Sequence, residues 1–90
     1  PAKLAERLIE RAKQLDAARP EAYFNHAVLL ERFGARWRGE KGLEQAIAQY
    51  EAFAARGRGR SDLAADIDDV TASRIPDLRV MLEAERGASR

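Results

Sequence analysis

Apolar residues recur at spacings of three and four along most of this 90-residue chain. This spacing places apolar side chains on one face of an α-helix, which turns once in about 3.6 residues. A half-buried strand would instead alternate apolar and polar residues, and no segment of the sequence does so. Good helix formers, above all Ala, Leu, Glu and Arg, dominate the remaining positions. The pattern therefore predicts an all-α protein.

Four helical segments follow from these stripes. The expected helices span residues 3–16, 21–33, 42–56 and about 61–86. The stripe of the first helix consists of Ala5, Leu8, Ile9, Ala12 and Leu15, and the charged residues between them are expected to face solvent. Pro20 separates the first two helices, because proline disfavours helix at the residue before it and suits a first helical turn.

Glycine, serine and proline set the other expected boundaries. Gly34 is expected to end the second helix in a left-handed conformation, with residues 35–41 forming a loop. Ser61 is expected to cap the fourth helix. Pro76 interrupts the last stripe, which fits either one kinked helix or two short helices; of these we favour a break near Arg74 to Pro76.

Composition limits the chain to one modest domain. Residues 1–90 suit a single domain, and 46% of them are hydrophobic, enough for one small core. The absence of cysteine excludes disulfides and thiolate metal sites. No apolar stretch approaches the roughly 20 residues that a membrane-spanning helix needs. The sequence indicates no compartment and is compatible with both cytoplasm and periplasm.

Charge is unevenly distributed although the formal net charge is only +1. Residues 32–60 contain seven basic and three acidic side chains. Residues 61–85 contain seven acidic and two basic side chains. We interpret both segments mainly as solvated helix faces, so charge alone indicates no polyanionic partner.

A two-helix unit occurs twice in the sequence. Three residues of the first helix match three of the third at a constant offset of 41 residues: Ala5 with Ala46, Ile9 with Tyr50, and Ala12 with Phe53. Pro20 and Ser61, which begin the second and fourth helices, are also 41 apart. This offset exceeds the tetratricopeptide period of 34 by 41 − 34 = 7 residues, which is close to two helical turns.

The unit resembles the tetratricopeptide repeat. Residues 5–16, followed by Pro20, resemble the second helix of one repeat and its exit. The next repeat is carried by residues in the family's aromatic, small, large apolar and turn positions, namely Tyr23, Ala27, Leu30, Gly34, Ala46, Tyr50 and Phe53. The resemblance covers residues 5–56 and departs from the family at three points. The turn is too long, Phe53 is larger than the usual alanine, and residues 61–86 do not repeat the signature.

The resemblance implies antiparallel helical hairpins stacked as a short superhelix, with residues 61–86 as a C-terminal capping element. Its concave side would be lined by the second predicted helix. The implied partner-binding residues on that helix are Glu21, Phe24, Asn25, Val28, Glu31 and Arg32. Asn25 is the most informative of them, because an amide offers both donors and an acceptor to a peptide backbone. The alternative is a surface asparagine that bonds a neighbouring loop.

Trp37, flanked by Arg36 and Arg38, is a further candidate anchor for a partner, or else a side chain that covers a helix end. The arginine–glycine run at residues 56–60 resembles RNA-binding segments, but a turn after a helix explains it as well. His26 is the only histidine and is expected to be a packing residue. The aspartates at residues 66–69 lack the calcium-loop signature. No catalytic set, nucleotide-binding loop or metal site is recognised, so we expect neither an enzyme nor a cofactor.

The sequence thus predicts a protein-interaction module or scaffold that binds a protein or peptide on a concave helical face. The alternative is self-association, or a structural repeat segment, through an unshielded stripe of Leu4, Leu8 and Leu15. Nucleic-acid binding through Trp37 and the arginines is the least favoured interpretation.

Overall fold

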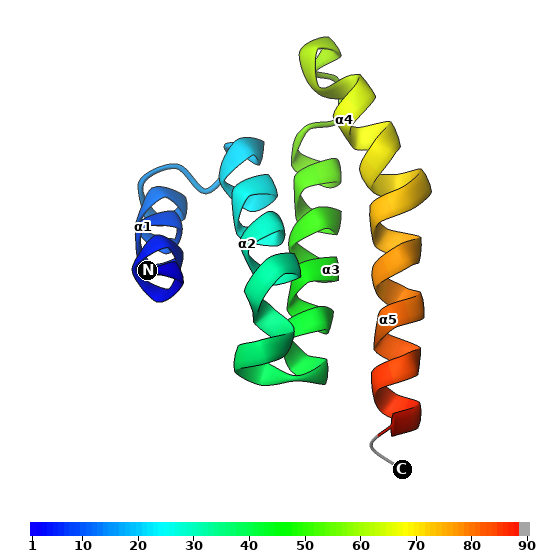
Figure 1. Cartoon of the computed structure of the whole chain (residues 1–90). Coiled ribbons are helices and arrows are strands. Elements are labelled where there is room, and N and C mark those ends of the chain that lie inside the picture. The colour runs from blue at the N-terminus through cyan, green and yellow to red at the C-terminus, as the bar shows by residue number, and fades with distance from the viewer. Residues whose placement is uncertain (89–90) are drawn as a thin grey trace.

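A computed structural model describes residues 1–88 and is helical almost throughout (Figure 1). The long helices are α1 (Ala2–Leu15), α2 (Pro20–Arg38), α3 (Glu40–Arg56) and α5 (Ile75–Ala88). A short 3₁₀ turn (Ser61–Leu63), α4 (Ala64–Asp69) and a π-helical turn (Val70–Arg74) lead into α5. The described residues contain no strand, so the predicted all-α class is confirmed.

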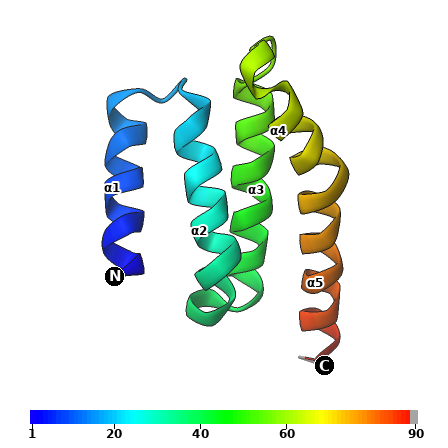
Figure 2. The same cartoon turned by 45° about the horizontal axis from the view of Figure 1, so that its top comes forward.

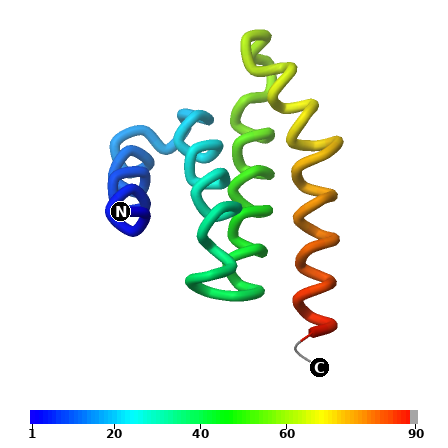
Figure 3. The backbone as a smooth tube through the Cα atoms, viewed as in Figure 1, coloured from blue at the N-terminus to red at the C-terminus, as the bar shows by residue number. Residues whose placement is uncertain are grey.

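The four long helices stand side by side, and each runs opposite to the long helix before it (Figures 1 and 2). The order across the molecule follows the order along the chain, with α1 and α5 at opposite ends (Figure 3). The Cα atoms extend over 41 × 30 × 16 Å. The result is an elongated, shallow stack that leaves the outer sides of α1 and α5 uncovered.

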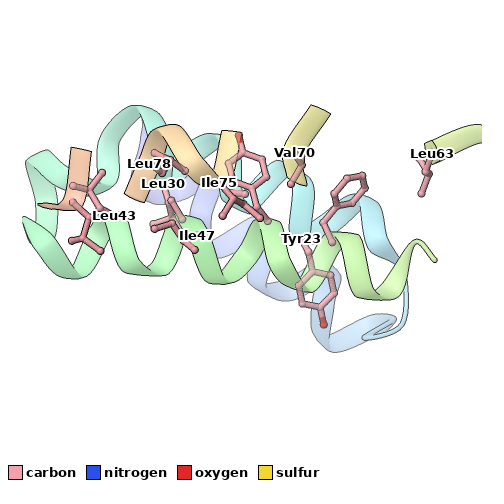
Figure 4. Close-up of a cluster of buried hydrophobic side chains, with 13 residues drawn as sticks. Tyr23, Leu30, Leu43, Ile47, Leu63, Val70, Ile75 and Leu78 are labelled. Atoms are coloured by element: carbon pink, nitrogen blue, oxygen red, sulfur yellow. The ribbon is translucent and has the colours of Figure 1, made fainter. Parts of the chain in front are cut away.

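The hydrophobic core lies between α2, α3 and the helical run after residue 61 (Figure 4). Its largest side chains that are under 2% exposed are Tyr50, Phe53, Leu30, Leu43, Leu78 and Val70. Ala27 and Ala46 are fully buried where α2 and α3 meet. By contrast, α1 contributes no buried residue within residues 2–15. Part of the predicted apolar stripe of α1 therefore faces solvent, because Leu8 and Leu15 are exposed.

Two glycines bring α2 and α3 into backbone contact. A Cβ atom added to Gly42 would overlap the carbonyl oxygen of Gly34, and one added to Gly34 would lie 3.1 Å from the carbonyl oxygen of Gly42. The predicted helix stop at Gly34 is wrong, since α2 continues to Arg38. Gly34 is needed for close packing rather than for a turn.

The connection between α2 and α3 is a single residue. Gly39 takes a φ of 57°, a conformation that costs glycine little, and its amide donates to the carbonyl of Ala35 at 2.8 Å. The predicted loop at residues 35–41 is therefore wrong, because every other residue of that range belongs to α2 or α3.

The last helical run also differs from expectation. No break separates Arg74 from Pro76, since a π-helical turn at Val70–Arg74 leads directly into α5. In that turn the amide of Ile75 donates to the carbonyl of Val70, five residues back. The wider turn accommodates Pro76, which has no amide to donate and would clash in a regular helix. Ser61 makes no capping hydrogen bond, so its predicted role is also wrong.

Candidate interaction site

Six of the seven predicted partner-binding residues lie on one side of α2. At 100° per residue they span about 120° of the helix surface. We call this set the α2 outer face; it consists of Glu21, Phe24, Asn25, Val28, Glu31 and Arg32. The structure thus brings these six together, although they differ in exposure and in role.

Phe24 and Val28 are half-buried and pack against the core. The Phe24 ring meets Phe53 edge to face, with ring centroids 5.0 Å apart, and meets Tyr50 at 5.9 Å. Such pairs are each worth about 0.5–1.5 kcal/mol beyond their buried area. These two side chains therefore form the fixed apolar floor of the α2 outer face.

Glu31 belongs to a hydrogen-bonded cluster with Tyr50 and Arg74. The Tyr50 hydroxyl donates to Glu31 at 2.8 Å, and Arg74 Nη1 donates to Glu31 Oε2 at 3.2 Å and to the Tyr50 hydroxyl at 3.1 Å. Burial and the Glu31 carboxylate raise the pKa of Tyr50 well above its ordinary value, so the phenol stays protonated. Glu31 is therefore already satisfied within the chain.

Arg74 is a residue that the sequence did not single out. It lies in the π-helical turn, which directs it across to α2, where it also approaches Asp69 at 3.4 Å. Turns of this kind occur often at functional positions. The sign of this turn in the sequence is Pro76, two residues later, where the pattern favours a helix break instead.

The other members of the α2 outer face reach solvent. Glu21 accepts two hydrogen bonds from Arg60, at 3.0 and 3.2 Å, and this pair lowers the pKa of the Glu21 carboxyl. Asn25 is exposed and lines a shallow groove of about 260 Å³ beside Leu8 of α1. Arg32 is exposed, and neither it nor Asn25 bonds another side chain within residues 1–88.

Trp37 lies apart from the α2 outer face. It belongs to the last turn of α2, where its ring stacks on Phe33 with centroids 5.9 Å apart and planes inclined by 18°. The guanidinium of Arg38 lies 5.7 Å from the ring. Trp37 is half-buried and stacked on Phe33, and it does not join the other six residues.

A second group of polar side chains lies between α1 and the α2–α3 hairpin. We call it the α1 polar cluster; it consists of Glu6, Lys13, His26, Arg38, Gln45 and Gln49. These residues line or adjoin an open groove of about 570 Å³. His26, only 5% exposed, is the buried packing residue that was predicted. Its polar partners were not foreseen, because Glu6 and Lys13 were expected to face solvent.

Hydrogen bonds join this cluster across three helices. The Lys13 ammonium donates to His26 Nδ1 at 2.5 Å and to Gln49 at 2.6 Å, and His26 Nε2 donates to Glu6 at 2.9 Å. Both oxygens of Glu6 accept from Arg38, at 2.6 and 3.1 Å. The Arg38 bonds lower the pKa of Glu6, whereas burial lowers the pKa of Lys13. Charge-assisted hydrogen bonds of this cluster therefore attach α1 to α2 and α3, and α1 contributes no buried residue to the hydrophobic core.

Glu6→Gln is expected to weaken the attachment of α1 by about 1–2 kcal/mol at neutral pH, because Gln loses the charge that Arg38 and His26 bind. The pKa of Glu6 is lowered from 4.5 in the folded state, so its contribution is complete above that value. It disappears as the pH falls through the lowered pKa. Hydrogen exchange of the α1 amides, measured from pH 7 to pH 3, checks both parts. A difference in α1 protection between the native chain and the variant that does not shrink as the pH falls would contradict the assignment.

No family model matches this chain, and neither a curated protein nor a solved structure matches it. Within residues 1–88 no group of His, Asp and Glu side chains is arranged to hold a metal ion. None of the helices that the structure describes is both long enough and apolar enough to cross a membrane. The candidate sites therefore depend on geometry and chemistry alone.

Proposed function

We propose that this chain is a protein-interaction module that binds a protein or peptide on the α2 outer face. The observation that carries the proposal is that exposed polar side chains without side-chain partners lie beside apolar side chains that are packed on the core. Asn25 and Arg32 reach solvent without a side-chain partner within residues 1–88, while Phe24 and Val28 beside them are anchored in the core. The anchored side chains, Phe24 and Val28, are preorganised and lose little conformational entropy on binding.

The chemistry of the α2 outer face favours a ligand with an available backbone and an acidic group. The Asn25 amide can donate to a peptide carbonyl and accept from a peptide amide at the same time. Arg32 offers a planar donor pair that suits a carboxylate. The Glu31 carboxylate already accepts hydrogen bonds from Tyr50 and Arg74. It therefore repels an acidic ligand less than an unpaired carboxylate would.

We also propose that the chain is a divergent member of the tetratricopeptide repeat class. The supporting observation is burial at the positions that carry the resemblance. Tyr23, Leu30 and Tyr50 are buried, and Ala27 and Ala46 have no exposed surface where α2 and α3 meet. The close glycine contact between Gly34 and Gly42 adds to the narrow spacing of this hairpin.

Combining Asn25→Ala with Arg32→Glu is expected to weaken partner binding at least tenfold, since it removes an amide and reverses a charge. Both residues are exposed, so helical content should not change. Val28→Glu is a poorer test, because Val28 packs on the core and a charge there costs stability. The matched control is Lys41→Glu, which makes the same charge reversal at an exposed position of α3.

The measurement is affinity capture from a nuclease-treated native lysate, followed by titration calorimetry with the captured protein. Loss of binding in the double variant, with binding retained in the control, supports the proposal. Equal binding by all three proteins excludes the α2 outer face as the site.

A further inference from the structure

Large apolar side chains are exposed only at the two ends of the stack, within the part of the chain that the structure describes. Leu4, Leu8 and Leu15 of α1 are 53%, 63% and 75% exposed. Val80 and Met81 of α5 are 70% and 49% exposed. These two helices are the outermost elements (Figure 1), so the apolar side chains lie where another helix could pack.

On α1 the three leucines form a narrow strip beside a basic one. At 100° per residue the leucines fall within about 40° of the helix surface, and Leu8, at the edge of this strip, also borders the groove beside Asn25. Arg7 and Arg11 occupy the adjoining sector, and both also line the groove of the α1 polar cluster. Both are exposed, and neither forms an ion pair with the described residues. The outer side of α1 is therefore apolar and basic.

On α5 the corresponding strip is apolar and acidic. Asp77, Val80, Met81 and Ala84 fall within about 100° of the helix surface, opposite the buried Ile75. Asp77 is exposed and has no cation within ion-pair distance in residues 1–88. Asp77 therefore gives this strip an acidic edge, opposite in charge to Arg7 and Arg11 of α1.

The internal repeat independently marks the leucine strip as a contact surface. The 41-residue offset that relates α1 to α3 pairs Leu4, Leu8 and Leu15 with Gln45, Gln49 and Arg56.

All three of these α3 residues contact preceding parts of the chain. Gln45 accepts from Arg38, Gln49 accepts from Lys13, and Arg56 donates to the carbonyl of Ala17. The equivalent strip on α1 lacks such a neighbour within the described residues, and it is apolar instead of polar.

We propose that the chain self-associates head to tail, with the outer side of α1 packed against the outer side of α5 of a second copy. The leucines would meet Val80 and Met81, and Arg7 and Arg11 would lie opposite the acidic end. Because the two surfaces differ, the contact is heterologous and each added copy exposes a new end. This association does not depend on partner binding, since it uses none of the residues of the α2 outer face.

Sedimentation velocity from low micromolar to about 1 mM protein tests the proposal. The average mass of the native chain should rise above 10.1 kDa with concentration and fall back at high salt. Leu8→Glu and Val80→Glu should each lower the association constant at least tenfold, because each puts a charge into the apolar contact. The control is Ala48→Glu at an exposed position of α3, which should associate like the native chain.

Mixing the two variants provides the sharpest result. The Leu8→Glu chain retains an intact α5 and the Val80→Glu chain retains an intact α1, so together they should form a one-to-one dimer that grows no further. A native chain that stays at monomer mass throughout overturns the proposal. So does a mixture that fails to dimerise. Self-association of either variant alone would also overturn it, because that result would indicate contact between identical surfaces. Partner capture by the Val80→Glu variant is a separate readout and should be unchanged, because Val80 does not line the groove beside Asn25.

Discussion

Gly42→Ala is expected to destabilise the protein by at least about 3 kcal/mol, enough to unfold much of a domain of this size. The added Cβ would overlap the backbone of Gly34, and a backbone cannot move aside as a flexible side chain can. Relief requires α2 and α3 to separate, which would open the core around Ala27 and Ala46. Urea unfolding followed by helical circular dichroism measures the loss.

Two other glycines calibrate this result. Gly34→Ala should cost less than Gly42→Ala, since its Cβ would lie 3.1 Å from the nearest atom. Gly87→Ala is the matched control, because nothing lies within 4 Å of the added atom. It should be neutral, or stabilise the helix by up to about 1 kcal/mol. If Gly42→Ala were as stable as the control, the close helix contact would be wrong.

Phe53→Ala should cost about 3–5 kcal/mol, the usual range for an aromatic ring removed from a core. Phe53 is 1% exposed and meets the Phe24 ring at 5.0 Å. Its loss would leave a cavity and remove the support of the α2 outer face, so partner binding should weaken too. The large ring at this position, a departure from the tetratricopeptide pattern, is explained by its contact with Phe24.

Phe53→Leu controls for the cavity, since it retains most of the apolar volume and should cost less than about 1.5 kcal/mol. Thermal and urea unfolding rank the two variants. Equal losses for alanine and leucine would show that ring contacts, and not the cavity, dominate at this position.

The sequence predicted the helices better than their ends. Apolar spacing located α1 and α3 to within two residues of their observed bounds, because that spacing reflects the face that each helix turns towards its neighbour. Gly34 was misassigned because a glycine that ends a helix and one that admits a neighbouring backbone look alike locally. The difference depends on Gly42, eight residues away, and appears only once the two helices are packed.

The candidate sites show the same limit. The resemblance to the tetratricopeptide repeat implied the six residues of the α2 outer face as a group. It could not show that Glu31 is bound by Tyr50 and Arg74, because those residues come from other helices. Glu6 and Lys13 were assigned to solvent for the same reason. A charged residue on a helical wheel looks exposed until its partner is in place.

The one-residue connection at Gly39 also affects how the chain can be cut or extended. A protease needs several residues of extended backbone, and the join between α2 and α3 offers none. The exposed arginines at 58 and 60, between α3 and the last helical run, are more accessible to trypsin. Limited digestion should therefore leave α2 and α3 joined in one fragment, and an inserted tag should be tolerated near Gly59 rather than near Gly39.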